Sequence, residues 1–166
     1  SPPSVTSTTP AHGAAGVTTD ANITATFSED VSVSGEWLQI ACATSGTRGL
    51  SDVTVSGGPQ SYTIDPSADF AVGESCSVTI YAARVADTDA ADPPDTLAAD
   101  YVFSFEVDSP PRVTSTLPAN NATGVTLTSP ITITFSESVA FSAASFALEC
   151  HGSTRTFTLN TSSPAT

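Results

Sequence analysis

The opening of the chain recurs in its second half, and this repeat limits the fold more strongly than any local motif. Residues 1–34 align without a gap on residues 109–142, and 21 of the 34 positions are identical. A repeat of about 108 residues has the size of a common domain. We therefore expect one complete domain at residues 1–108 and the first half of a second, homologous domain at residues 109–166.

Within the first copy, short segments alternate apolar and polar residues, which is the pattern of half-buried β-strands. The clearest are residues 23–27 (ITATF), 76–81 (CSVTIY) and 101–107 (YVFSFEV). Clusters of Gly, Pro, Ser and Asp separate such segments as turns, and no segment keeps a helical period over three turns. The sequence thus predicts an all-β fold, an antiparallel immunoglobulin-like β-sandwich. The expected core contains Phe27, Trp37, Ile40, Val78, Ile80, Phe103 and Phe105.

Two of the three cysteines are predicted to form a disulfide. Cys42 and Cys76 each share a strand face with apolar residues, so both sulfur atoms are expected to point into the core. Two free buried thiols are the alternative. Cys150 aligns with Cys42, and its own partner would fall near position 184, beyond the end of this chain. A disulfide indicates an oxidising compartment, so we expect a secreted or cell-surface protein.

The charge of the chain excludes two classes of partner. The formal net charge is -13, lysine is absent, and arginine occurs four times. Nucleic acids and anionic membranes are bound through clustered Lys and Arg, so we expect neither as a partner. The first copy carries 15 acids against two arginines and therefore holds all of the net charge. No run of 18 apolar residues is present, so no membrane insertion is expected.

The densest acidic segment, DTDAADPPD at residues 87–95, is a candidate calcium site. Ca²⁺ takes six to eight oxygen ligands, and alternating carboxylates followed by a third acid can converge on one ion. Asp87, Asp89 and Asp92 offer this start, with Asp95 or backbone carbonyls as further ligands. The alternative is a solvated loop that protects an edge of the sandwich and keeps the domain soluble.

We find no catalytic motif, and we expect no enzyme activity and no other cofactor. His12 and His151 are the only histidines, and neither has a histidine at the matching position of the other copy. Glu29 and Glu137 recur in the motif TFSE and are expected to accept backbone hydrogen bonds at a strand end. For Trp37, packing in or beside the core and stacking on a sugar both remain open.

The two openings of the repeat resemble a known family. The pattern PPxVTSTxPAxxAxGVT followed by ITxTFSExV, at residues 2–31 and again at 110–139, is similar to the bacterial immunoglobulin-like domain of the S-layer (SbsA) type. Residues 62–107 resemble the later half of the same domain, in which strands flank a variable polar loop. Such domains occur in S-layer proteins, adhesins and secreted multidomain hydrolases or nucleases, usually as spacers or binding modules.

The resemblance implies a non-catalytic structural or spacer module of a secreted or cell-surface multidomain protein. Its partners would be the neighbouring domains of the same polypeptide. Pro110 and Pro111 would restrict the joint between the two copies. One alternative is an adhesion module that binds a glycan or a surface protein, with a calcium-dependent variant of that role. A second alternative is an accessory domain of a secreted hydrolase or nuclease.

Overall fold

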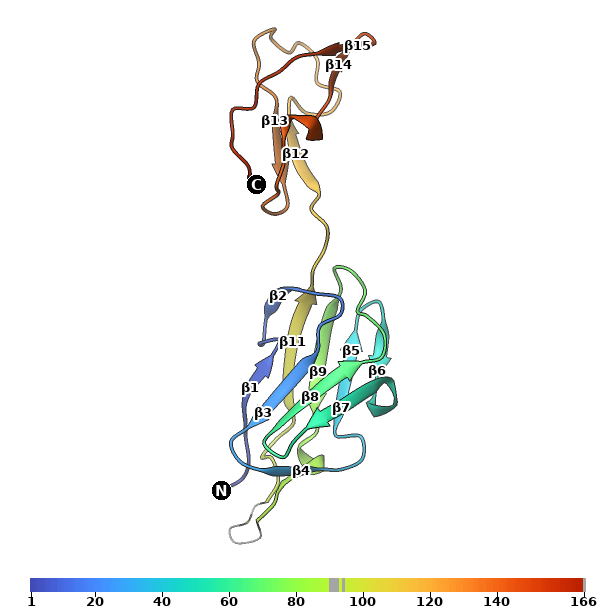
Figure 1. Ribbon diagram of the computed structural model, residues 1–166, viewed down its shortest axis with the longest axis vertical. Coiled ribbons are helices and arrows are strands. Elements are labelled where there is room, and N and C mark those ends of the chain that lie inside the picture. The colour runs from blue at the N-terminus through green and yellow to red at the C-terminus, as the bar shows by residue number, and fades with distance from the viewer. Residues whose placement is uncertain (90–92, 94, 166) are drawn as a thin grey trace. The chain divides into compact units, whose positions relative to one another are not determined.

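The computed structural model describes residues 1–89, residue 93 and residues 95–165, and it divides the chain into two compact units. Unit 1 is Ser1–Ser109 and unit 2 is Pro110–Thr166. Both are built from β-strands and short 3-10 turns (Figure 1). In the described part of the chain, no helix has the length and apolar character needed to cross a membrane.

The first sheet of unit 1 has four antiparallel strands in the order β1-β3-β8-β7. Exposure alternates along the central strand β3, where Ile23, Ala25 and Phe27 are at most 1% exposed and the residues between them are half-buried. This is the alternation expected from the sequence, because successive side chains of a strand point to opposite faces. The strands are β1 (Val5–Thr9), β3 (Ile23–Phe27), β7 (Val53–Gly57) and β8 (Ser61–Pro66).

The second sheet has five strands in the order β2-β11-β9-β5-β6, with β9 at its centre. β2 runs parallel to β11, and the other neighbours are antiparallel. On β9, Val78 faces Phe103 of β11 on one side and Ile40 of β5 on the other. The strands are β2 (Ala14–Val17), β5 (Leu38–Cys42), β6 (Gly46–Arg48), β9 (Ser75–Ile80) and β11 (Tyr101–Val107).

A third, two-stranded ladder lies at one end of unit 1, where β4 is labelled in Figure 1. It pairs β4 (Val31–Val33) with β10 (Val85–Asp87), so that Val31 faces Asp87. Two 3-10 turns, η1 (Leu50–Asp52) and η2 (Ala82–Arg84), connect strands of the first unit.

Side chains from both large sheets form one hydrophobic core, which confirms the predicted immunoglobulin-like sandwich. All seven residues expected in the core are at most 2% exposed. Aromatic contacts extend the packing: the rings of Phe70 and Phe105 are 5.3 Å apart and those of Trp37 and Tyr62 are 5.5 Å apart. Because Trp37 is buried, its role is packing, and it does not offer a surface for a sugar.

Unit 2 begins with a strand pair that repeats the register of unit 1. β12 (Val113–Leu117) pairs with β13 (Thr132–Phe135), and Val113 faces Phe135. In unit 1, Val5 faces Phe27 in the same way, and a register shift follows in both ladders. The sequence repeat is therefore also a structural repeat. Unit 2 continues with η3 (Ala143–Ser145) and the hairpin of β14 (Leu148–Cys150) and β15 (Ser153–Arg155).

Two side-chain hydrogen bonds recur together with this register. In unit 1, Oγ1 of Thr6 donates to the carbonyl of Thr26 at 3.1 Å, and Oγ of Ser28 accepts the backbone N–H of Ser4 at 3.0 Å. In unit 2, both bonds occur at the matching positions of the repeat, at 3.1 Å each. The serine of the recurring TFSE motif holds the strand end in both units. The role expected for its glutamate stays a prediction.

Candidate functional site

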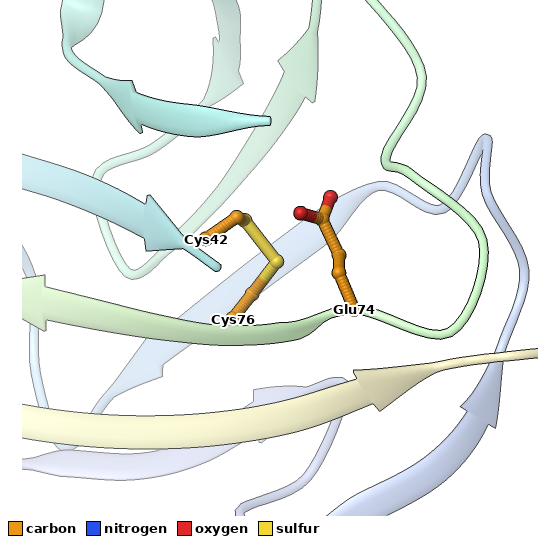
Figure 2. A group of neighbouring side chains, drawn as sticks. All are labelled: Cys42, Glu74 and Cys76. Atoms are coloured by element: carbon orange, nitrogen blue, oxygen red, sulfur yellow. A yellow bond between two sulfur atoms is a disulfide. The ribbon is translucent and has the colours of Figure 1, made fainter. Parts of the chain in front are cut away.

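A group of hydrogen-bonded side chains in unit 1 surrounds a disulfide. Cys42 and Cys76 lie directly opposite each other on β5 and β9, and their sulfur atoms are bonded (Figure 2). Cys76 is 2% exposed. The predicted disulfide is confirmed, and free buried thiols at these positions are excluded. The bond joins neighbouring strands of one sheet, so it reinforces a ladder that backbone hydrogen bonds already hold.

Glu74 is a buried carboxylate beside this disulfide, 3% exposed, and sequence reasoning did not single it out. It precedes Cys76 by two residues, and residues two apart in extended chain share a face. Its Oε2 accepts the backbone N–H of Thr44 at 3.0 Å and of Ser45 at 2.8 Å. Its Oε1 accepts the hydroxyl of Ser45 and the backbone N–H of Ala71, both at 2.6 Å. Glu74 thereby ties the turn between β5 and β6 to the turn that leads into β9.

The pKa of Glu74 reflects two opposing effects. Burial by itself raises the pKa of a carboxyl group, because the charged form loses its hydration. The donors from Ser45, Ala71 and Thr44 favour the charged form and outweigh burial, so the pKa of Glu74 is lowered. Glu74 is therefore an ionised, fully hydrogen-bonded structural group near neutral pH.

Cys42, Glu74 and Cys76 are the one group of three metal-ligating residue types that lie close together in the described part of the chain. Their ligand atoms lie within 4.8 Å of one another. However, both sulfur atoms are in the disulfide. A carboxylate has about four acceptor positions, and Glu74 already accepts four hydrogen bonds. The arrangement is therefore a structural brace and does not form a metal centre.

The acidic segment begins on β10. Asp87 is 8% exposed, and its backbone N–H donates to the carbonyl of Asp95 at 2.7 Å. Asp89 is exposed, and Asp92 lies outside the described residues. Within the described residues, Asp87 and Asp89 do not belong to any group of three with metal-ligand spacing. Calcium binding by Asp87, Asp89 and Asp92 stays a prediction.

Tyr62 lies near the end of unit 1 that holds the β4–β10 ladder. Its hydroxyl donates to the carbonyl of Val31 at 2.9 Å. Burial, and secondarily the charge of Asp30, raise the pKa of Tyr62. Tyr62 is thus a neutral donor that fixes β4 against the first sheet.

Both histidines occupy structural positions. Nδ1 of His12 accepts the backbone N–H of Ser104 on β11 at 3.2 Å, which holds the turn after β1 against the second sheet. His151 and Gly152 form the two-residue turn between β14 and β15, with positive φ angles of 51° and 74°. Two consecutive positive φ angles are typical of a type I′ hairpin turn.

The sequence profile of one known family matches nearly the whole chain. The sequence profile of the bacterial Ig-like domain matches residues 1–107 and residues 107–165. No curated protein is similar enough to this chain to count as a relative. The crystal structure of CopC from Methylosinus trichosporium OB3b is 19% identical, with a TM-score of 0.48, over 64% of this chain and 94% of that chain.

Two similar structures come from a bacterial surface layer. Domains 1–6 of the surface layer protein SbsC are 16% identical, with a TM-score of 0.41, over 81% of this chain and 18% of that chain. The N-terminal part of the S-layer protein SbsC is 15% identical, with a TM-score of 0.43, over 81% of this chain and 31% of that chain.

Removing the disulfide is expected to destabilise unit 1. The two cysteines are separated by 34 positions, and closing a loop of this length stabilises a domain by about 3 to 4 kcal/mol on the chain-entropy model. We predict that the double substitution Cys42→Ser and Cys76→Ser lowers the free energy of unfolding by about that amount. Urea denaturation measures it, with Cys150→Ser as the control, expected to change stability by less than about 0.5 kcal/mol. Equal effects of the two changes would contradict a structural role for the bond.

Glu74→Gln is expected to destabilise unit 1 by about 2 to 3 kcal/mol at pH 7, because an ionised acceptor of hydrogen bonds is lost and buried donors are left poorly paired. The folded-state pKa of Glu74 lies below its unfolded value. Its contribution is therefore complete above the unfolded pKa and declines as the pH falls through the folded pKa. Unfolding measured from pH 7 to pH 3 should show the difference between wild type and variant shrinking only at the acidic end.

The matched control is Glu106→Gln, which changes an exposed glutamate on β11 in the same way. We expect this variant to stay within about 0.5 kcal/mol of wild type at pH 7. A wild-type to Glu74→Gln difference that is constant down to pH 3 would show that the carboxylate charge of Glu74 is not what stabilises the two turns.

Proposed function

We propose that this chain, which belongs to the bacterial Ig-like domain family, is a non-catalytic structural module that spaces the parts of a secreted or cell-surface protein. The proposal rests on how the chain enters and leaves unit 1. Figure 1 shows the N-terminus and the end of β11 at opposite ends of this unit. A sandwich traversed in this way adds its own length between the segments before and after it.

The residues at both ends of unit 1 are held against the sandwich, by burial at the start and by hydrogen bonds at the end. At the start, Pro3 is fully buried. At the end, the backbone N–H of Asp108 donates to the carbonyl of Val17 at 2.7 Å, and the carbonyl of Asp108 accepts the N–H of Gly73 at 2.9 Å. A side-chain oxygen of Asp108 accepts the N–H of Ser109 at 2.9 Å. These bonds hold the last residues of unit 1 against its own sandwich, which supports the spacer role.

The joint after Ser109 supports the same role. The residues Ser-Pro-Pro open unit 1 and recur at 109–111, so the joint belongs to the repeat itself. Proline fixes its own φ angle and restricts the residue before it, so Pro110 and Pro111 narrow the conformations that the joint can adopt. The Cys42–Cys76 disulfide supports an oxidising, extracellular setting for the module.

The spacing role can be tested by small-angle X-ray scattering on proteins that contain one, two or three tandem copies of residues 1–108, so that Ser1, Pro2 and Pro3 of each following copy occupy the joint as Ser109, Pro110 and Pro111 do in this chain. We expect each added copy to increase the maximum dimension by a similar increment. Replacing Pro2 of each following copy, the counterpart of Pro110, by Gly while keeping the buried Pro3 should broaden the distance distribution, because glycine removes the restriction on the backbone. A maximum dimension that does not grow with copy number would overturn the proposal.

A calcium-dependent binding module is the second candidate. The observation in its favour is the hydrogen bond between the backbones of Asp87 and Asp95, which brings two acidic residues of the segment together at one end of unit 1. This role predicts that Ca²⁺ binds at physiological salt with measurable heat and raises the melting temperature. Isothermal titration should show that Asp89→Ala weakens this binding, whereas Asp20→Ala, a change of an exposed acid outside the segment, does not.

The two candidates give different outcomes. No heat of Ca²⁺ binding and no shift in melting temperature would end the calcium hypothesis and leave the spacer role standing. If Ca²⁺ does bind, a glycan array probed with and without EDTA tests whether the bound ion supports recognition of a carbohydrate.

A further inference from the structure

The turn that follows the first strand recurs in both units with the same geometry. In unit 1, a backbone hydrogen bond of 3.0 Å closes the turn of residues 11–14, and Gly13 has a φ of 76°. In unit 2, the same bond at 3.0 Å closes the turn of residues 119–122, and Asn121, which aligns with Gly13, has a φ of 62°. A type II turn requires a positive φ at its third residue and favours Gly or Asn there. The turn is therefore part of the structural repeat.

Only the second copy of this turn leads into a motif for covalent modification. Residues 121–123 read Asn-Ala-Thr, whereas the aligned residues 13–15 read Gly-Ala-Ala. The positive φ of the turn accounts for Asn121, because Asn tolerates the left-handed region better than most residues. It does not account for Thr123, which lies after the turn. Asn-X-Ser/Thr is the acceptor triplet for N-linked glycans of secreted proteins, and such an acceptor lies on the surface.

Unit 1 shows that this position stays open in a sandwich with two large sheets. Gly13 and Ala15 are exposed, and a Cβ added at Gly13 would meet no heavy atom within 4 Å beyond its chain neighbours. The backbone N–H of Gly13 donates to the carbonyl of Ser104 at 2.7 Å, which holds the turn against β11. In unit 2, Asn121 and Thr123 are exposed as well. Because the matching position of unit 1 is open beside both sheets, the exposure of the triplet does not depend on how many strands unit 2 has.

A second triplet of the same kind, at residues 22–24, is placed differently. Asn22 is exposed, but Ile23 is 0% exposed and faces Ile64 across the β3–β8 ladder. Thr24 pairs with Thr63 in the same ladder and is half-buried. A transferase must reach both the Asn and the hydroxyl residue two positions later, so this triplet becomes accessible only when β3 leaves its sheet.

We propose that Asn121 is an acceptor site for an N-linked glycan, and that the folded protein receives this glycan outside the cytoplasm from an oligosaccharide linked to a lipid pyrophosphate. Nδ2 of Asn121 attacks C1 of the sugar that is joined to the pyrophosphate, and a C1–Nδ2 bond forms. The bond from C1 to the pyrophosphate oxygen breaks, and the lipid pyrophosphate leaves with that oxygen. Nδ2 loses one proton to the solvent. No atom is oxidised or reduced in this transfer.

This inference rests on the extracellular setting of the proposed function and does not rest on the spacing role. In unit 1, the matching turn is bound to Ser104, the middle residue of β11 (Tyr101–Val107), and so lies away from both ends of the sandwich. A glycan at this position leaves the ends of a unit open to neighbouring domains. Failure of the glycan test therefore leaves the scattering test of the spacer role unaffected, because that test measures dimensions and not modification.

The test uses the whole folded chain, a purified single-subunit oligosaccharyltransferase that recognises Asn-X-Ser/Thr, and a lipid-linked oligosaccharide. A third triplet begins at Asn160, so every protein carries Asn160→Gln and only two triplets compete. Peptide mass spectrometry measures the glycosylated fraction at each Asn. We expect Asn121 to be occupied at least about tenfold more than Asn22, because a core strand opens at a cost close to the global free energy of unfolding. A synthetic peptide of residues 116–126 is the positive control for the enzyme.

Variants separate the position of the turn from the motif itself. Thr123→Ala should abolish transfer to Asn121, because the hydroxyl of the triplet is lost. The double change Gly13→Asn with Ala15→Thr moves the triplet into unit 1 and should create an acceptor there, whereas Gly13→Asn alone should not. No glycan on Asn121 of the folded chain while the peptide is glycosylated, equal occupancy of Asn22 and Asn121, or no transfer to the triplet placed in unit 1 would each overturn the proposal.

Discussion

The pairing of β9 with both β5 and β11 is the interaction on which unit 1 depends. The central strand of the five-stranded sheet contributes Val78 and Ile80 to the core and brings Cys76 opposite Cys42. Each neighbour of β9 comes from a distant part of the chain, so forming this sheet costs loop-closure entropy before the core is buried. The disulfide reduces that cost by shortening the loop between two of the strands in the unfolded chain. Glu74 then fixes the turns at the same end of the ladder.

Comparing the two units shows which strand pairs recur in both of them. The strand pairs β1–β3 and β12–β13 share their register and their side-chain hydrogen bonds, so this substructure is specified by the residues within it. In unit 1, its apolar side chains belong to the core that both large sheets share. In unit 1, Phe27 is 1% exposed, whereas Phe135 at the matching position is half-buried.

Sequence reasoning recovered the features that depend on residue spacing and missed those that depend on contacts between distant segments. Period-2 alternation predicted β3, β9 and β11, and the placement of Cys42 and Cys76 on apolar faces predicted their bond. The short strands β4 and β10 were missed because three residues are too few to show a period. Glu74 was missed because a single glutamate near a turn carries no pattern; the one available signal was its place two residues before a buried cysteine. Ser28 was missed as well, because only its position in the structure shows that its hydroxyl accepts the backbone N–H of Ser4.

The sequence by itself determined the repeat, the strand character of its segments, the family and the excess of acidic over basic residues. The repeat, the strand pattern and the family depend on the order of residues along the chain, and the net charge is a sum over residues. None of them requires knowledge of which strands become neighbours. Only the tertiary structure decided that Trp37 packs in the core, that the disulfide lies within one sheet, and that Asp108 is held between β2 and the turn before β9. The physical reason is that burial and hydrogen bonding of a side chain depend on which strand becomes its neighbour. In this sandwich, strands that are neighbours in a sheet are often distant in sequence. The neighbour of a strand is therefore set by the packing of the whole sheet.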